Sequence, residues 1–165
     1  MNASGGQVFN VPIVAAALST GNTWDLCGLT AQSSGRLEIL GIDLTVASTQ
    51  FASGSAIALQ FLRGSTGLST GAAILPRNVK GWSGASTAFF GATGPSSTPV
   101  STASAVSVYA GSFDFRGRFQ YRPMSREERL ILTLSQPLHI RTTTPQIAVS
   151  INGTIVVQDV GKVPA

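Results

Sequence analysis

The sequence predicts an all-β protein, an antiparallel β-sandwich or barrel. Short segments in which apolar and polar residues alternate recur along the 165-residue chain, and a period of two is typical of half-buried strands. Gly, Pro, Ser or Asn bounds each segment, as in sandwiches. Helix signals are scarce, because the capping-box pattern at Ser125–Glu128 precedes residues that alternate like a strand. The length fits one domain with its own core.

The first segments predict an N-terminal arm followed by a long, irregular strand. We expect residues 1–23 to form an arm outside a sandwich domain of residues 24–160. After Arg36, the apolar positions are odd up to Ile39 and even from Leu40 to Val46. One extra residue near Leu40–Gly41 explains this change, so we expect a β-bulge or a bend there.

The middle of the chain predicts one regular strand and then long loops. Ile57, Leu59 and Phe61 alternate with small or polar residues, which indicates a half-buried strand. The stretch from Gly64 to Ser104 is rich in small and polar residues but also contains aromatic side chains. We therefore expect long ordered loops with short strands, packed on the body or on a neighbouring subunit.

Aromatic and basic residues alternate in the next segment. Phe113, Phe115, Phe119 and Tyr121 occupy odd positions around Gly117. This pattern predicts one strand with an aromatic inner face and a basic outer face.

The last third of the chain predicts further short strands and a closing hairpin. Leu138 and Ile140 alternate with His139 and Arg141, which places His139 on an outer face, in contact with solvent or a partner. Apolar residues flank Asn152–Gly153, so we expect a hairpin there, with a three-residue loop that ends in a bulge. Residues 161–165 are expected to form a C-terminal tail.

The composition indicates a surface that is covered by other subunits. Only 11% of the residues are charged and 43% are hydrophobic, whereas about 25% of a typical soluble domain is charged. Such a surface belongs in a membrane or against other protein. The apolar stretch Val11–Leu18 is too short to span a bilayer. Residues 1–10 lack the basic residues of a secretory signal, and the lone Cys27 cannot form an intrachain disulfide. We therefore expect a protein kept in the cytoplasm or in particles assembled there.

The residues that carry chemistry are scattered. The chain has one His, one Cys and seven acidic residues, whereas metal sites require such residues in clusters. His139 is the only histidine that could act as a base, and the sequence lacks a nucleophile elbow and a phosphate-binding loop. We expect no catalytic site, no metal and no cofactor.

A cluster of arginines is the one feature of the sequence that suggests a binding surface. Five of the nine lie within fourteen residues: Arg116, Arg118, Arg122, Arg126 and Arg129. Arginine makes planar, bidentate contacts and suits interfaces, so these residues are candidates for contacts with carboxylates of a partner. Arg116 and Arg118 could equally pair with Asp114, Glu127 and Glu128 inside the subunit. The net charge of +4 would also suit nucleic acid, but the aromatic residues alternate inward and are not predicted to be exposed for stacking, which argues against that partner.

Several segments resemble small β-sandwich structural proteins of tailed bacteriophages and prophages. They are Trp24–Ala31, Gly35–Ile42, Phe61–Gly64, Tyr121–Pro123 and Glu127–Ile131. The likeness extends from about Trp24 to Gln158, with loose motifs and with Ser125–Arg126 where the pattern has Pro. The resemblance implies a jelly-roll topology and a capsid decoration or cement protein, or part of a spike or fibre, often trimeric.

Together these observations predict a non-catalytic structural protein on the capsid surface of a phage virion. We expect a homo-oligomer, preferably a trimer, that binds the major capsid protein and has no membrane contact. The arm residues Val8, Phe9, Val11 and Ile13 would lie on a neighbouring subunit. The alternative is a receptor-binding or glycan-binding module of a tail fibre or spike, which would contact its ligand through Trp82, Phe89 and Phe90.

Overall fold

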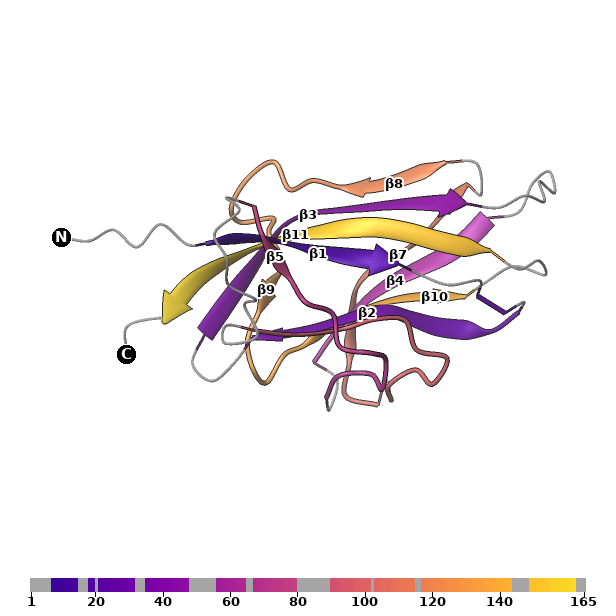
Figure 1. Ribbon diagram of the computed structural model, residues 1–165, viewed down its shortest axis with the longest axis horizontal. Coiled ribbons are helices and arrows are strands. Elements are labelled where there is room, and N and C mark those ends of the chain that lie inside the picture. The colour runs from indigo at the N-terminus through magenta and orange to yellow at the C-terminus, as the bar shows by residue number, and fades with distance from the viewer. Residues whose placement is uncertain are drawn as a thin grey trace.

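The computed structural model contains two antiparallel β-sheets packed face to face (Figure 1). It describes residues 7–14, 18–19, 21–31, 35–47, 56–64, 67–79, 90–101, 103–114, 117–143 and 149–162. Every strand found in these ranges pairs antiparallel with its neighbours. The predicted all-β fold, an antiparallel sandwich, is therefore confirmed.

Each sheet combines long central strands with shorter ones. Sheet 1 has the order β5 (Arg77–Asn78), β1 (Val8–Val14), β11 (Ser150–Lys162), β3 (Gly35–Ala47) and β8 (Arg118–Tyr121), and β9 (Ile131–Leu132) also pairs with β3. Sheet 2 has the order β6 (Phe90–Thr93), β2 (Thr23–Ala31), β10 (Leu138–Thr143), β4 (Ala56–Arg63) and β7 (Val106–Asp114). In Figure 1, the long strands of sheet 1 lie above those of sheet 2.

Alternate residues of both sheets fill the space between them. On β4, Ile57, Leu59 and Phe61 are fully buried while Ala58 and Gln60 are exposed, as their alternation predicts. Burying apolar area contributes about 25 cal/mol per Å², so the inner faces of the long strands provide the main stabilisation of the fold.

The predicted bulge in β3 is present. Val156 of β11 pairs with Gly41, and the next residue, Val157, pairs with Ile39. Leu40 is therefore the extra residue on β3, and it is only half-buried. Because of this bulge, odd-numbered residues of β3 face inward before Leu40 and outward after it.

The prediction of an N-terminal arm is wrong for residues 8–14. These residues form β1, which pairs with β11 from Val8 opposite Gln158 to Val14 opposite Asn152. The residues that we expected on a neighbouring subunit therefore lie in the sheet of this subunit: Val8, Phe9, Val11 and Ile13. Because Phe9, Val11 and Ile13 are at most 1% exposed, they stabilise this core and are not free to contact another chain. Sheet 1 also includes residues 161 and 162 of the predicted tail.

The predicted hairpin at Asn152–Gly153 is also wrong. Both residues lie inside β11, where they pair with Thr45 and Leu44 of β3. A Cβ atom on Gly153 would overlap the carbonyl oxygen of Asp43 and approach Leu44 Cδ2 to 2.7 Å. Glycine is therefore required by the close approach of two strands, and not by a turn.

The aromatic segment around Gly117 is divided between the two sheets. Phe113 lies on β7 in sheet 2, whereas Phe119 and Tyr121 lie on β8 in sheet 1; Phe115 lies outside the described residues. The single strand that we predicted is therefore two strands. The rings still face the common core, since Phe113 and Phe119 are 6.0 Å apart between centroids.

Loops cover part of the outer face of sheet 2. Residues 67–76 and 94–100 lie below β2 in Figure 1, and the backbones of Ser96 and Asp25 exchange two hydrogen bonds of 2.9 and 3.0 Å. Ile74 donates to the Ala92 carbonyl and Gly94 donates to the Ala72 carbonyl. The described part of the Gly-rich and Ser-rich region is thus ordered and packed on the body, as the sequence predicts.

Candidate functional site

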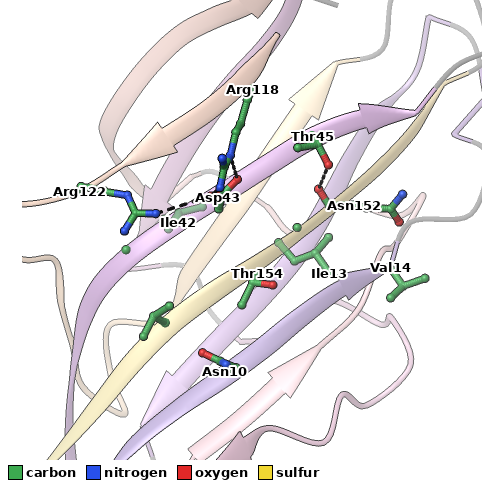
Figure 2. A pocket seen from close by; sticks show the side chains of 13 residues that line it. Asn10, Ile13, Val14, Ile42, Asp43, Thr45, Arg118, Arg122, Asn152 and Thr154 are labelled. Carbon is green, nitrogen blue, oxygen red and sulfur yellow. Dashed lines mark hydrogen bonds and ion pairs between the residues drawn. The ribbon is translucent and has the colours of Figure 1, made fainter. Parts of the chain in front are cut away.

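A groove of about 600 Å³ lies on the outer face of sheet 1 (Figure 2). The strands β1, β11, β3 and β8 supply its lining, together with Arg122, which directly follows β8. Even-numbered residues of β1 and β11 face outward there, and the bulge at Leu40 turns Asp43 and Thr45 to the same side. The side chains that define the groove are Asn10, Val14, Asp43, Arg122, Asn152 and Thr154.

One wall of the groove is formed by Asp43 and its basic partners. Arg118 donates two hydrogen bonds to the Asp43 carboxylate, one of them of 2.6 Å from Nε to Oδ1. Gln120 donates to Oδ2 at 3.1 Å. The hydrogen bond from Arg118, which outweighs the effect of burial, lowers the pKa of Asp43. Asp43 is therefore ionised near neutral pH and holds Arg118 in place.

Arg122 is the arginine of this wall that is most available to a partner. Its Nη2 lies 3.8 Å from Asp43 Oδ2, and its side chain is 71% exposed. Arg118 already forms the short, bidentate contact with the same carboxylate. With one carboxylate and two guanidinium groups, this wall carries a net positive charge that favours an anionic group.

A second set of arginines surrounds Glu38 on β3. Arg36, Arg126 and Arg129 lie 3.3, 2.9 and 3.0 Å from its carboxylate oxygens. Burial raises the pKa of Glu38, but the hydrogen bonds from Arg126 and Arg129 outweigh it and lower that pKa overall. These contacts fasten the turn after β8 to sheet 1, so Arg126 and Arg129 have a structural role.

The predicted arginine cluster is therefore two separate groups. Arg118 and Arg122 lie at the groove, Arg126 and Arg129 bind Glu38, and Arg116 lies outside the described residues. Pairing inside the subunit, which the sequence left open, does occur. For the four arginines of the cluster that the structure describes, the acceptors are Asp43 and Glu38, because β8 and the following turn pack beside β3.

Other groove residues were missed by sequence reasoning. Asn10, Asn152 and Thr154 gave no signal, because Asn10 was assigned to an arm and Asn152 to a turn. Asp43 could have been placed on the outer face, since it follows the predicted bulge and alternates with Ile42 and Leu44.

The aromatic residues of the alternative hypothesis are not located. Trp82 and Phe89 lie outside the described residues, and for Phe90 only the backbone, at the start of β6, is described.

A buried polar cluster lies on the outer face of sheet 2, beneath the covering loop. Arg141 on β10 donates from Nε to Asp25 Oδ1 at 2.7 Å and from Nη2 to the Val100 carbonyl at 2.7 Å. Asp25 Oδ2 accepts a hydrogen bond of 2.8 Å from the Val100 amide. The ion pair thus attaches the loop at Val100 to β2 and β10.

His139 lies in the same cluster and is fully buried, so its predicted exposure on the outer face is wrong. The physical reason is the loop over sheet 2, which covers a face that the alternation alone assigns to solvent. A Cβ atom on Gly28 would lie 3.1 Å from His139 Cδ2, so the imidazole packs directly on the β2 backbone. Burial lowers the pKa of His139; Asp25 opposes this effect and Arg141 adds to it.

Acidification is expected to destabilise the protein through His139. Between about pH 7 and about pH 5.5, the unfolded chain takes up a proton near the ordinary pKa of 6.5 while the folded chain excludes it. The contribution of His139 to stability is therefore fully present above that pKa. It decreases as the pH falls below it, by at most about 1.3 kcal/mol in this window. Urea unfolding at several pH values measures this loss.

The variant His139→Gln is the control for this pH dependence. It lacks the titrating group and should show little change of stability across the same window. Glu38 and Asp43 titrate at lower pH, because both of their pKa values are lowered. Equal slopes for the two proteins would contradict the assignment.

The described residues contain no group of three or more His, Cys, Asp and Glu side chains that could hold a metal ion. Within those same ranges, no helix has the length and apolar character to cross a membrane. Burial raises the pKa of the Cys27 thiol to about 12, which keeps it protonated. Comparison of the chain with protein-family models, curated proteins and solved structures finds no significant match.

Proposed function

We propose that this protein is a non-catalytic structural protein of a tailed-phage virion, which binds the capsid surface as a decoration or cement subunit. The observation that carries the proposal is the groove on sheet 1, a rigid strand surface that presents Arg122 to a partner. A positively charged wall beside neutral side chains suits the carboxylates of another protein. The major capsid protein is the proposed partner.

The strand order supports the jelly-roll assignment. Without the short strands β5, β6 and β9, sheet 1 has the order β1-β11-β3-β8 and sheet 2 has the order β2-β10-β4-β7. The eight strands of a jelly roll form two Greek keys, an arrangement found in viral capsid and lectin domains. This argument is an analogy at the level of the fold, so the groove and not the topology carries the functional proposal.

The low content of charged residues supports assembly with other subunits. We propose a homo-oligomer on the virion, in which copies of the chain cover one another's neutral surfaces. Exposed apolar side chains on the described surface are consistent with such contacts. They include Val14, which lines the groove and is 72% exposed, and Val106, which is 63% exposed.

Replacing Arg122 with Glu is expected to weaken binding to the capsid at least tenfold while the subunit stays folded. The change inverts the charge that faces the partner, whereas among the described residues the side chain has one ion pair, a long contact with Asp43. Binding is measured by co-sedimentation with heads of the encoding phage that were assembled without this chain. Circular dichroism and thermal unfolding check the fold.

Arg63→Glu is the matched control, because it makes the same change of charge at the end of β4 in the other sheet. It should bind the heads like the unaltered chain. Full occupancy of the heads by Arg122→Glu would refute the proposed contact.

The polar lining of the groove favours a second candidate function, a glycan-binding module of a tail fibre or spike. Asn10, Asp43, Asn152 and Thr154 all line it, and such side chains donate to and accept from sugar hydroxyl groups. Binding of the full chain to a glycan array, lost in Asn152→Ala, would favour this function. Hundreds of copies per particle would instead favour decoration.

A further inference from the structure

We propose that two copies of this chain pair along the free edge of β7, so that sheet 2 continues from one subunit into the other. This inference rests on the oligomer in the proposed function, but not on capsid binding. The groove lies on sheet 1 and β7 lies in sheet 2. The two surfaces can therefore be tested separately.

The edges of the two sheets differ in length. Sheet 1 ends in β5 with two residues and β8 with four, and sheet 2 ends in β6 with four residues and β7 with nine. Short edge strands present few unpaired backbone groups, which limits pairing with other chains. On one side β7 pairs with β4 from Val106 to Asp114, and no described strand pairs with its other side. Within the described part of the chain, a long backbone edge is therefore open.

The sequence of β7 contains little that would block pairing. Its nine residues include one charged side chain, Asp114 at the end, and neither Lys nor Pro. The one protective device is a bulge at Val108, because Phe61 pairs with Tyr109 and Leu62 pairs with Ser107. Residues 109–114 follow as a regular run. A regular, neutral edge of this kind is the usual template for another strand.

The edge is complementary to itself. In an antiparallel pair centred on Gly111, Tyr109 lies opposite the second copy's Phe113 on the core side. Ala110 then lies opposite the second copy's Ser112 on the outer side. Cross-strand aromatic pairs stabilise sheets, and Gly111, Ala110 and Ser112 are exposed and small, so the backbones can approach. The Asp114 side chains lie at opposite ends, where like charges do not face each other.

Such a contact joins two copies and no more, because both copies use the same patch. The five residues that pair in this register, 109–113, span about 17 Å, which is small for an interface, so a dimer with a dissociation constant in the micromolar range is expected. The resemblance to phage proteins implies a trimer instead. The measured mass therefore distinguishes edge pairing from a threefold assembly.

The double variant Ala110→Lys/Ser112→Lys tests the inference. In the proposed register it places lysines opposite each other at two positions, so the dissociation constant should rise at least tenfold. Sedimentation velocity of the full chain over a range of concentrations measures this change. The unaltered chain should reach twice the monomer mass of 17.0 kDa.

Two further variants keep the test decisive. The variant Ala110→Asp/Ser112→Asp should also be monomeric by itself. An equimolar mixture of the Lys and Asp variants should form heterodimers. Heterodimer formation would show that both variants are folded and that they pair in this register. Ala56→Lys/Ala58→Lys is the matched control, with the same charges on the same outer face but on β4. It should dimerise normally.

Three results would overturn the inference. The unaltered chain could remain a monomer at a protein concentration about 100 times the expected micromolar dissociation constant. It could form a trimer that the two lysines leave intact, or the control variant could dissociate as much as the Lys variant. None of these results bears on the Arg122 assay, since that substitution lies on the other sheet. Loss of capsid binding in Arg122→Glu with an intact dimer would support the groove without affecting β7.

Discussion

Arg141→Met is expected to lower the free energy of unfolding by about 3–5 kcal/mol. The substitution leaves the Asp25 carboxylate, which is fully buried, without its cation. It also removes the donor to the Val100 carbonyl. An unpaired buried charge is far more costly than the absence of the whole ion pair, since desolvation of the charge is no longer offset.

Urea unfolding measures the loss, and hydrogen exchange locates it. The Val100 amide, which donates to Asp25, and the Ser96 amide, which donates to the Asp25 carbonyl, should exchange faster in the variant. In this variant, we therefore expect the loop over sheet 2 to unfold locally at a lower free energy than the rest of the β-sandwich.

Two controls separate the buried ion pair from a general effect of removing arginine. Arg63→Met, on β4 of the same sheet, should change the stability by about 0.5 kcal/mol or less. The double variant Asp25→Leu/Arg141→Met should recover part of the loss, because it leaves no isolated charge. If Arg141→Met alone cost less than about 1 kcal/mol, the pair would not be the buried attachment point of the loop.

Phe61→Ala is expected to cost about 3–5 kcal/mol. The ring of Phe61 is fully buried. Its centroid lies 4.9 Å from that of Tyr109 in sheet 2, and 5.7 and 6.1 Å from those of Phe119 and Tyr121 in sheet 1. The cavity left by alanine would lie between the sheets, where their edges approach, and the surrounding strands cannot close it fully.

Thermal and urea unfolding measure this effect against two controls. Phe61→Leu keeps most of the apolar contact and should lose clearly less stability. Gln60→Ala changes the neighbouring exposed residue of β4 and should leave the stability within about 0.5 kcal/mol of the unaltered chain. Similar losses for Phe61→Ala and Gln60→Ala would contradict the placement of the ring.

The features that could be predicted from the sequence depend on near neighbours in the chain. Ile57, Leu59 and Phe61 reveal a half-buried strand because adjacent side chains of a strand face opposite sides. The change of parity after Ile39 reveals the bulge at Leu40 for the same reason.

The candidate site could be predicted only in part. Arg118 and Arg122 were recognised from their spacing, but their acceptor, Asp43, is more than seventy residues earlier in the chain. Asn10 and Asn152 line the same groove because β1 and β11 pair. Pairing between the two ends of a chain leaves no periodic signal in the sequence.

Alternation and turn residues determined that this chain forms short antiparallel strands around an apolar core, because those signals act within a few residues. Tertiary structure alone decided that β1 completes sheet 1, that Gly153 lies inside a strand, and that Phe113 and Phe119 belong to different sheets. It also decided that His139 is buried, although its alternation places it on an outer face. Each of these outcomes depends on which distant strand or loop covers a given face, and that choice is made by packing over the whole domain.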